Sequence, residues 1–248
     1  MAHYFISDVH LGYGDRPGDL LRERRLLRFL DGIRADAQSL FIVGDLFDYW
    51  FEYRSVIPKR HFRTLAAITA FAERGCAVHY IIGNHDFGHR DFFQTEVGAV
   101  MHEGDYETTL DGKKFYIAHG DGKAANDLGY RILKKILRSK INLKLFSLLH
   151  PDLGIAIAAR ASHGSRAYTA QKDYGPTDGM TEFAKRKLAE GFDYVVMGHR
   201  HKPLQVPANG GLYVNLGDWI RHFSYAVCEQ GVLSLRTYEE QLHIEPNH

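Results

Sequence analysis

Short apolar runs, each followed by polar residues, recur along the chain. Six of them are rich in β-branched and aromatic residues, and they cover residues 4–7, 40–44, 78–83, 114–120, 193–199 and 211–217. Near-continuous apolar runs of this length are typical of strands that are buried on both faces. Helix-length patterns at 20–33 and 60–75 separate the first three runs. Strand, helix and strand in series predict an α/β layered fold, and the closer spacing of the later runs favours a mixed pair of sheets.

The rhythm of strands breaks between about residue 122 and residue 180. The ranges 128–150 and 153–173 have helical periodicity, with apolar residues on one side and lysine and arginine on another. We therefore expect a helical cap at 122–180, inserted into a core formed by 1–121 and 181–248. The sequence contains no internal repeat and no low-complexity linker.

Charge is distributed unevenly, although the 248-residue chain has a formal net charge of only +1. Between Lys123 and Lys172, ten Lys and Arg residues stand against two acidic residues. Such a run is either a solvated helix face or a surface for a phosphate-rich or anionic-membrane partner. Its basic residues are interleaved with aliphatic ones, with few aromatic rings to stack on bases, so we expect no nucleic-acid partner.

Polar clusters follow five of the apolar runs, in the order D-x-H, G-D, G-N-H-D, H-G and G-H-x-H. Their members are Asp8, His10, Asp45, Asp48, Asn84, His85, Asp86, His119, Asp121, His199 and His201. Any one cluster alone would most simply be a turn. Because ligands of α/β sheets collect outside the carboxyl ends of the strands, five clusters in series indicate one shared crevice.

The residue types in these clusters favour a divalent metal site. Carboxylate, imidazole and amide oxygen together suit ions such as Mn, Fe, Zn or Co, and the absence of thiolate argues against a structural zinc site. Two such ions about 4 Å apart, bridged by one carboxylate, activate a nucleophile and clamp phosphoryl oxygens during in-line displacement. Asp45 is the candidate bridging carboxylate.

The series "DVH", "GDLFD", "GNHD", "HGD" and "GHRH" resembles the calcineurin-like metallophosphoesterase family, in order and across nearly the whole chain. The resemblance implies a four-layer α/β/β/α sandwich with the helical cap inserted in it. It also implies two divalent metal ions, and it assigns their ligands residue by residue. The first ion would take Asp8, His10, Asp45 and His201, and the second would take Asp45, Asn84, His119 and His199.

Within that family the chain is most similar to the UDP-2,3-diacylglucosamine pyrophosphohydrolases of lipid A biosynthesis. The similarity lies in the aromatic stretch "GDLFDYWFEY", in Asp127 eight residues after His119, and in the basic insertion before "GHRH". It implies a Mn²⁺-dependent hydrolase that splits UDP-2,3-diacylglucosamine into UMP and 2,3-diacylglucosamine 1-phosphate. The alternative is another calcineurin-like phosphoesterase, either a nucleotide phosphodiesterase or a phosphomonoesterase. A scaffolding module without catalysis would require damaged ligands, and all seven ligand positions hold competent residues.

The same resemblance implies a substrate-binding set, which consists of Asp127, Ser165, Thr169, Lys172 and His199. On a helix the spacing of Ser165, Thr169 and Lys172 turns all three side chains the same way. Thr169 stands where the family has asparagine. Without the resemblance, this set would equally be the polar face of a surface helix.

We expect Asn84, His85 and Asp86 to form the catalytic group, with Asp86 orienting His85. His85 would act as a general acid or as a cation over the developing phosphoryl charge. The lipid enzymes carry arginine at this position, whereas the wider superfamily carries histidine. The departing phosphate monoester has a second pKa of about 6 and is already a good leaving group, so either residue would serve.

Location and the remaining polar residues have simpler interpretations. The apolar runs are too short to span a bilayer, and we expect a cytoplasmic protein, peripheral to the inner membrane and in contact with its inner leaflet. Asp48 and Trp50 are either packing residues or part of a substrate pocket, and Asp218 is interpreted as a turn former.

Overall fold

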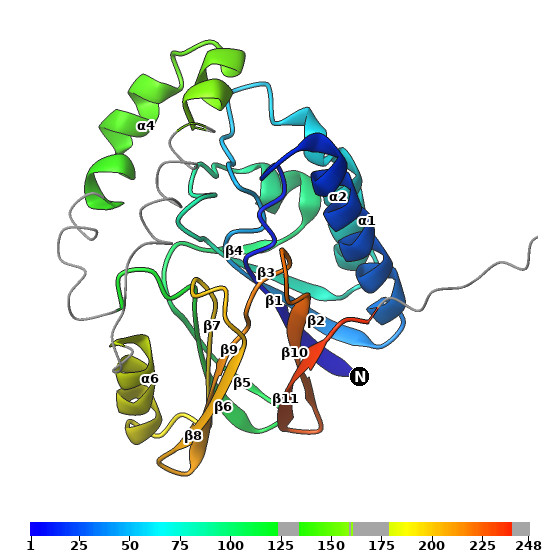
Figure 1. The fold of residues 1–248 in the computed structure, drawn as a ribbon, viewed down its shortest axis with the longest axis vertical. Coiled ribbons are helices and arrows are strands. Elements are labelled where there is room, and N and C mark those ends of the chain that lie inside the picture. Colours follow the sequence, from blue (N-terminus) through cyan, green and yellow to red (C-terminus); the bar gives the residue numbers. More distant parts are fainter. Residues whose placement is uncertain (124–133, 159, 161–178, 240–248) are drawn as a thin grey trace, which may run out of the picture.

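Two mixed β-sheets form the centre of the molecule (Figure 1). The computed structural model describes residues 1–123, 134–158, 160 and 179–239. The strands of the first sheet are β1 (Ala2–Ile6), β2 (Ala37–Val43), β3 (Ala77–Ile81), β4 (Val100–His102), β10 (Ser224–Glu229) and β11 (Val232–Thr237). Their order is β11-β10-β1-β2-β3-β4, and β1 to β4 run parallel to one another.

The second sheet has five strands. They are β5 (Tyr106–Leu110), β6 (Lys113–Ala118), β7 (Tyr194–Met197), β8 (Leu204–Ala208) and β9 (Gly211–Asn215). Their order is β5-β6-β7-β9-β8, with β6, β7 and β9 parallel and the outer strands antiparallel. Both sheets therefore have parallel centres, and a polar residue that follows a central strand lies at the same edge as its neighbours.

Helices cover the outer face of each sheet. These helices are α1 (Arg16–Ile33) and α2 (Phe62–Glu73) on the first sheet and α6 (Gly179–Ala189) on the second. Three apolar clusters fill the spaces between α1, α2 and the first sheet, between the two sheets, and between the second sheet and α6. Between the sheets, the ring of Phe5 stacks on Phe41 at 4.8 Å and on Phe115 at 5.7 Å. The predicted four-layer α/β/β/α sandwich is confirmed.

The ends of α1 and α2 follow from local chemistry. The side chain of Asp15 caps α1 by accepting a hydrogen bond from the backbone N–H of Gly18. After α2 the chain turns at Gly75, whose φ of +84° lies in the left-handed region that glycine adopts without strain. A 3₁₀ turn at Lys59–His61 and a π-helical turn at Phe93–Val97 complete the described core.

Beyond the sandwich, the described part of the predicted cap contains α4 (Lys140–Phe146) (Figure 1). The helical periodicity of 128–150 is interrupted at Ser139, which has an extended backbone. The Ser139 hydroxyl accepts a hydrogen bond from the N–H of Asn142 and so begins a new helix. Among the described residues, no helix is long and apolar enough to cross a membrane. The cap boundaries at 122 and 180 stay a prediction.

Candidate metal centre

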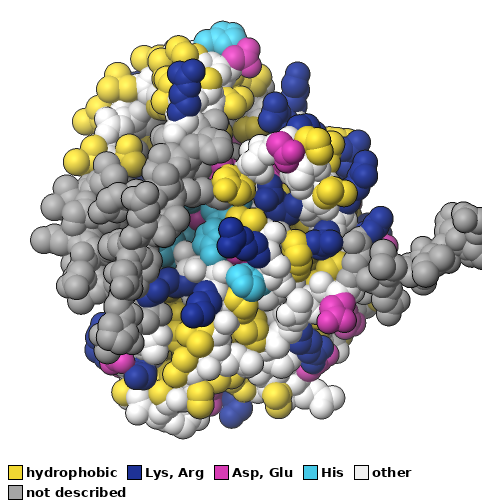
Figure 2. Space-filling model, in the orientation of Figure 1, with side chains coloured by type: hydrophobic (Ala, Val, Ile, Leu, Met, Phe, Trp, Pro, Cys, Tyr) yellow, Lys and Arg dark blue, Asp and Glu magenta, His cyan; other side chains and the backbone are white. Residues whose placement is uncertain are grey.

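Strand ends from both sheets bring most of the predicted ligands together. One cluster consists of Asp8, His10 and His201, and a second consists of Asp45, His119 and His199. Within each cluster, one ligand atom of every residue lies within 4.8 Å of the others. Figure 2 shows histidine side chains near the middle of this face, with Lys and Arg side chains close by. The separated motifs therefore converge in the described chain, as the sequence predicts.

Asp45 links the two clusters. Its Oδ2 lies 3.3 Å from His119 Nε2 and 3.8 Å from His10 Nε2, and its Oδ1 accepts a hydrogen bond of 2.8 Å from the backbone N–H of His85. Asn84 presents its Oδ1 at 2.9 Å from His119 Nε2. A carboxylate in this position is suited to bridge two cations.

The backbone is strained where the ligands are attached. Nine non-glycine residues of the described chain have positive φ, and five of them are predicted ligands. The five are Asp8, His10, Asp45, His199 and His201, with φ between 51° and 69°. Each such residue costs about 1–3 kcal/mol, and strain of this kind collects at functional sites. The positive φ changes the direction of the chain at each of these residues, just beyond the strand ends.

The glycines of the motifs make room for the ligands. A Cβ on Gly83 would lie 2.1 Å from Asp45 Oδ1, and one on Gly198 would lie 2.4 Å from Asp8 Oδ2. A Cβ on Gly44 would lie 2.4 Å from the ring of His119. Glycine therefore precedes a ligand in "GD", "GN" and "GH" because the opposite ligand occupies the space that a side chain would need.

Burial and charge make the crevice suited to a cation. Burial alone would raise the pKa of Asp45, but the neighbouring His119 and His85 hold it well below its usual range. Burial would likewise lower the pKa of His119, yet Asp45 raises it to about 10. Asp8 Oδ1 is buried and has no hydrogen-bond partner among the described residues. An orphaned carboxylate oxygen facing imidazole nitrogens is the donor set that a divalent metal ion completes.

Polar partners at the Nδ1 nitrogens orient three of the histidines. His119 Nδ1 lies 2.9 Å from the carbonyl oxygen of Val43. His201 Nδ1 lies 3.5 Å from Asp218 Oδ2, and His10 Nδ1 lies 3.3 Å from Asp48 Oδ1. Such partners fix the tautomer, so that Nε2 of each ring is directed to the metal position. Asp218 is thus more than the turn former that the sequence suggested, although its Oδ1 does accept from three backbone N–H groups at residues 220–222.

Asp48 also faces His85. Its Oδ1 lies 3.9 Å from His85 Nδ1, and His10, Asp48 and His85 form a third group with ligand atoms within 4.8 Å. Sequence analysis left Asp48 between packing and pocket lining. Its place three residues after Asp45 in "GDLFD" had already put it among the polar residues that follow the strands.

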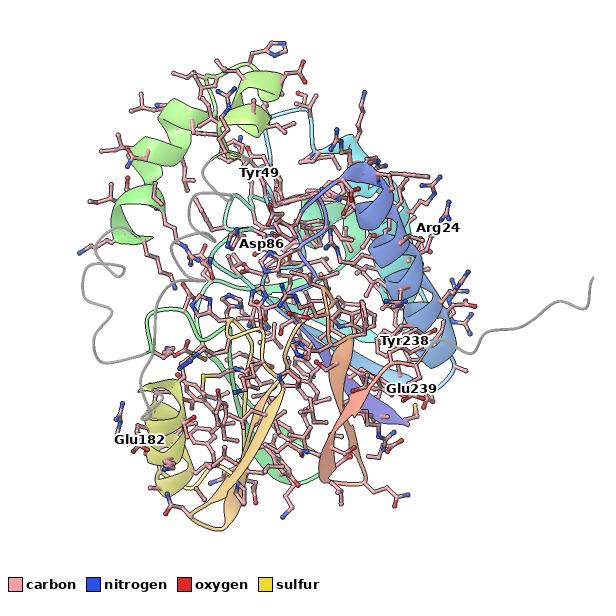
Figure 3. The ribbon with its side chains drawn as sticks, in the orientation of Figure 1. Arg24, Tyr49, Asp86, Glu182, Tyr238 and Glu239 are labelled. Carbon is pink, nitrogen blue, oxygen red and sulfur yellow. The ribbon has the colours of Figure 1, made fainter. Side chains whose placement is uncertain are left out.

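The expectation that Asp86 orients His85 is wrong. Asp86 is fully buried near the centre of the molecule (Figure 3), and its Oδ2 accepts from the N–H of Leu46 at 2.8 Å and from the Tyr80 hydroxyl at 2.5 Å. Its Oδ1 accepts from the N–H of Gly83 at 3.0 Å. Through these hydrogen bonds Asp86 connects the loop after β2 to the loop after β3. The carboxylate beside the His85 ring is that of Asp48.

A second buried carboxylate, which the sequence did not reveal, also holds this loop. Glu52 is 2% exposed, and its Oε2 accepts from the backbone N–H groups of Arg90, Asp91 and Phe92 at 2.7, 3.0 and 3.1 Å. Its Oε1 accepts from the Trp50 indole at 3.0 Å. The loop that carries Asn84 and His85 is therefore anchored at both ends.

The described cap residues meet the core beside this loop. Lys134 Nζ lies 2.6 Å from Asp121 Oδ2, and Arg138 donates a hydrogen bond of 2.5 Å to the carbonyl oxygen of Gly83. The ring of Phe146 in α4 lies 4.8 Å from that of Phe51. Four predicted substrate-binding residues, Asp127, Ser165, Thr169 and Lys172, lie outside the described residues.

Comparison with known proteins assigns the chain to a family. Residues 1–203 match the family described as calcineurin-like phosphoesterase. The chain is a calcineurin-like phosphoesterase. Several of its relatives carry the name UDP-2,3-diacylglucosamine hydrolase. One from Porphyromonas gingivalis is 32% identical, over 96% of this chain and 97% of the relative.

Two further relatives of that name are similarly complete. One from Aeromonas salmonicida is 30% identical over 93% of this chain and 91% of its own length. One from Neisseria meningitidis serogroup B is 31% identical over 90% of this chain and 91% of its own length. Membership of this family and the two clusters of histidine and aspartate together suggest that the chain binds divalent metal.

Gly83→Ala should lower the metal content of this phosphoesterase. The added Cβ, 2.1 Å from Asp45 Oδ1, must displace the linking carboxylate. We expect the divalent metal bound per chain, measured by elemental analysis after dialysis, to fall by at least half. Gly104→Ala is the control, because a Cβ there meets nothing within 4 Å. Equal metal content in the two variants would contradict the argument.

Asp48→Asn should impair the site without unfolding it. The amide keeps the size of Asp48 but loses the charge shared by His10 and His85, and such changes behind a ligand typically cost about 10–100-fold in metal affinity or activity. We expect a fall of that size in kcat on a chromogenic phosphodiester, with thermal unfolding little changed. Asp31→Asn, on the exposed side of α1, should leave kcat as it is. Equal activity in both variants would remove Asp48 from the site.

Proposed function

We propose that this protein is a metal-dependent hydrolase that cleaves the pyrophosphate of UDP-2,3-diacylglucosamine, giving UMP and 2,3-diacylglucosamine 1-phosphate. The observation that carries the proposal is the reach of the similarity to relatives of that name. It extends over at least 90% of the chain, and so beyond the short motifs that all calcineurin-like phosphoesterases share. A place in lipid A biosynthesis follows from that substrate.

The proposed cofactor is a pair of divalent ions, with Mn²⁺ as the expected metal. Asp8, His10, His201 and the linking Asp45 would hold the first ion. Asp45, Asn84, His119 and His199 would hold the second. When bound, the ions supply a water-derived nucleophile at neutral pH and neutralise charge on the phosphoryl oxygens.

His85 is the proposed group that stabilises the reacting phosphate. With Nδ1 turned toward Asp48, its Nε2 is the nitrogen left to face the substrate. The carboxylate of Asp48 orients the ring, and a positively charged ring in this position would stabilise the negative charge that develops on the phosphoryl group. The backbone N–H of His85, bonded to Asp45, fixes this cation relative to the metal ligands.

The cap is proposed to take the acylated sugar and to meet the inner leaflet of the inner membrane. Apolar side chains that are 46–77% exposed lie on and around α4, namely Ile136, Leu137, Ile141, Leu145, Leu148 and Leu153. Lys140 and Lys144 lie among them, and such a mixture suits an interfacial helix at an anionic surface. Asp127, Ser165, Thr169 and Lys172 remain the predicted substrate contacts. The protein would then be cytoplasmic and peripheral to the membrane.

The substrate is tested with Mn²⁺-loaded enzyme and detergent-dispersed UDP-2,3-diacylglucosamine. We expect release of UMP, measured by chromatography, with kcat/KM at least about 100-fold above the values for ATP, cyclic nucleotides and simple phosphomonoesters. The reverse order of activity would replace the proposal with a nucleotide phosphodiesterase or a phosphomonoesterase. Steeply salt-dependent binding of DNA would instead indicate a nuclease.

Variants of His85 separate its two possible roles. His85→Ala should lower kcat on the lipid substrate about 10²–10⁴-fold, which is the usual range for such a group. His85→Arg should stay within about tenfold of the unchanged enzyme, because a positive charge suffices for a good leaving group. His150→Ala, with a side chain that is 74% exposed, is the control. If arginine is as poor as alanine, proton donation is the essential role.

A further inference from the structure

A pocket of about 240 Å³ lies at the N-terminal part of α1. Its walls come from the loop that follows His10, from the first turns of α1, and from the loop 220–223. Figure 1 places α1 and α4 on opposite sides of the strand ends that carry the ligands. The pocket and the described part of the cap therefore flank the metal centre from two sides.

Both walls of the pocket are joined to metal ligands. The N–H of Tyr13 donates to the carbonyl oxygen of His10 at 3.1 Å. The N–H of Ile220 donates to Asp218 Oδ1 at 3.1 Å, and Asp218 Oδ2 lies 3.5 Å from His201 Nδ1. Each wall is therefore connected to a candidate ligand of the first metal ion, with His10 on one side and His201 on the other.

The lining combines planar and cationic side chains. Arg25 lies over the ring of Phe223, with its guanidinium carbon 3.9 Å from the ring centre. Arg22 is 8% exposed, and it donates to the carbonyl oxygen of Tyr13 at 2.5 Å and to Asp19 Oδ1 at 3.1 Å. The aromatic and guanidinium faces of Phe223 and Arg25 suit a planar ring.

The size of the pocket argues for one half of the substrate. Pockets for whole drug-sized ligands run from about 300 to 1,000 Å³, and this one is smaller. If the diphosphate sits on the metal ligands and the acylated sugar lies under the cap, the nucleoside is the half that remains. The reaction separates the two halves at the metal centre, between the pocket and the cap.

We propose that this pocket binds the nucleoside half of the substrate, the ribose and pyrimidine base of UMP. The proposal rests on the proposed function for the direction in which the substrate lies. Its own support is the cavity between the loops of His10 and Asp218, with Arg22, Arg25 and Phe223 in its walls. UMP would accordingly be a product that leaves from the α1 side.

The test uses UMP as an inhibitor of the Mn²⁺-loaded full-length enzyme, with hydrolysis of bis(p-nitrophenyl) phosphate as the reporter. This reporter carries no nucleoside, so it works whichever natural substrate is correct. We expect UMP to inhibit at least about tenfold more strongly than ribose 5-phosphate or inorganic phosphate. Leu21→Glu and Arg25→Gln should each weaken inhibition by UMP at least about fivefold, and leave inhibition by inorganic phosphate unchanged.

Arg24→Gln is the matched control, since Arg24 is exposed on α1 and does not line the pocket (Figure 3). It should leave both inhibition constants unchanged. Leu21 is 64% exposed, so Leu21→Glu keeps the test decisive if thermal unfolding shows that Arg25→Gln is destabilised. Inhibition by UMP that is no stronger than by ribose 5-phosphate, or that ignores both pocket variants, would overturn the proposal.

Failure of the two proposals can be told apart. If UMP inhibits through Leu21 and Arg25 while UDP-2,3-diacylglucosamine is not hydrolysed, the pocket is a nucleoside site of a phosphoesterase with another substrate. If the lipid substrate is hydrolysed but its KM is unchanged in Leu21→Glu and Arg25→Gln, the pocket proposal is wrong and the proposed function stands.

Discussion

Two buried carboxylates, Asp8 and Asp45, constrain the rest of the site. They are 0% and 1% exposed, and an ion pair or a metal must compensate for the water that each has lost. The two sheets provide that compensation by bringing His10 and His119 to Asp45, and His201 to Asp8, from distant parts of the sequence. The sandwich thus holds groups of opposite charge together at the carboxyl ends of the parallel strands of both sheets.

The constraint extends into the backbone. Ligands on five positive-φ residues and glycines with no room for a Cβ imply that the strand-end loops cannot relax independently. Asp86 and Glu52 hold these loops, because each buried carboxylate accepts hydrogen bonds from several backbone N–H groups. Asp86 accepts from Leu46 and Gly83, and Glu52 accepts from Arg90 and Phe92. Asp86 and Glu52 thus hold the strand-end loops in place although neither faces the candidate ligands. Their hydrogen bonds offset the backbone strain at the positive-φ ligand positions.

The two sides of the crevice differ in chemistry. On one side, Lys134 and Arg138 tie the cap to Asp121 and Gly83, and the exposed leucines and isoleucines around α4 provide an apolar surface. On the other side, α1 and the loop after Asp218 form a small pocket with arginine and aromatic walls. A substrate with a lipid at one end and a nucleoside at the other matches this polarity.

Sequence alone indicated the layered fold and the candidate metal ligands, because strand ends with a glycine and a polar residue form local, repeated patterns. The four layers and the two clusters around Asp45 agree with those patterns. Only the tertiary structure decided the partners of those ligands. Asp48 rather than Asp86 faces His85, Asp218 holds His201, and Glu52 anchors a loop some forty residues away. These contacts join residues far apart along the chain, and their geometry exists only after the strands have packed.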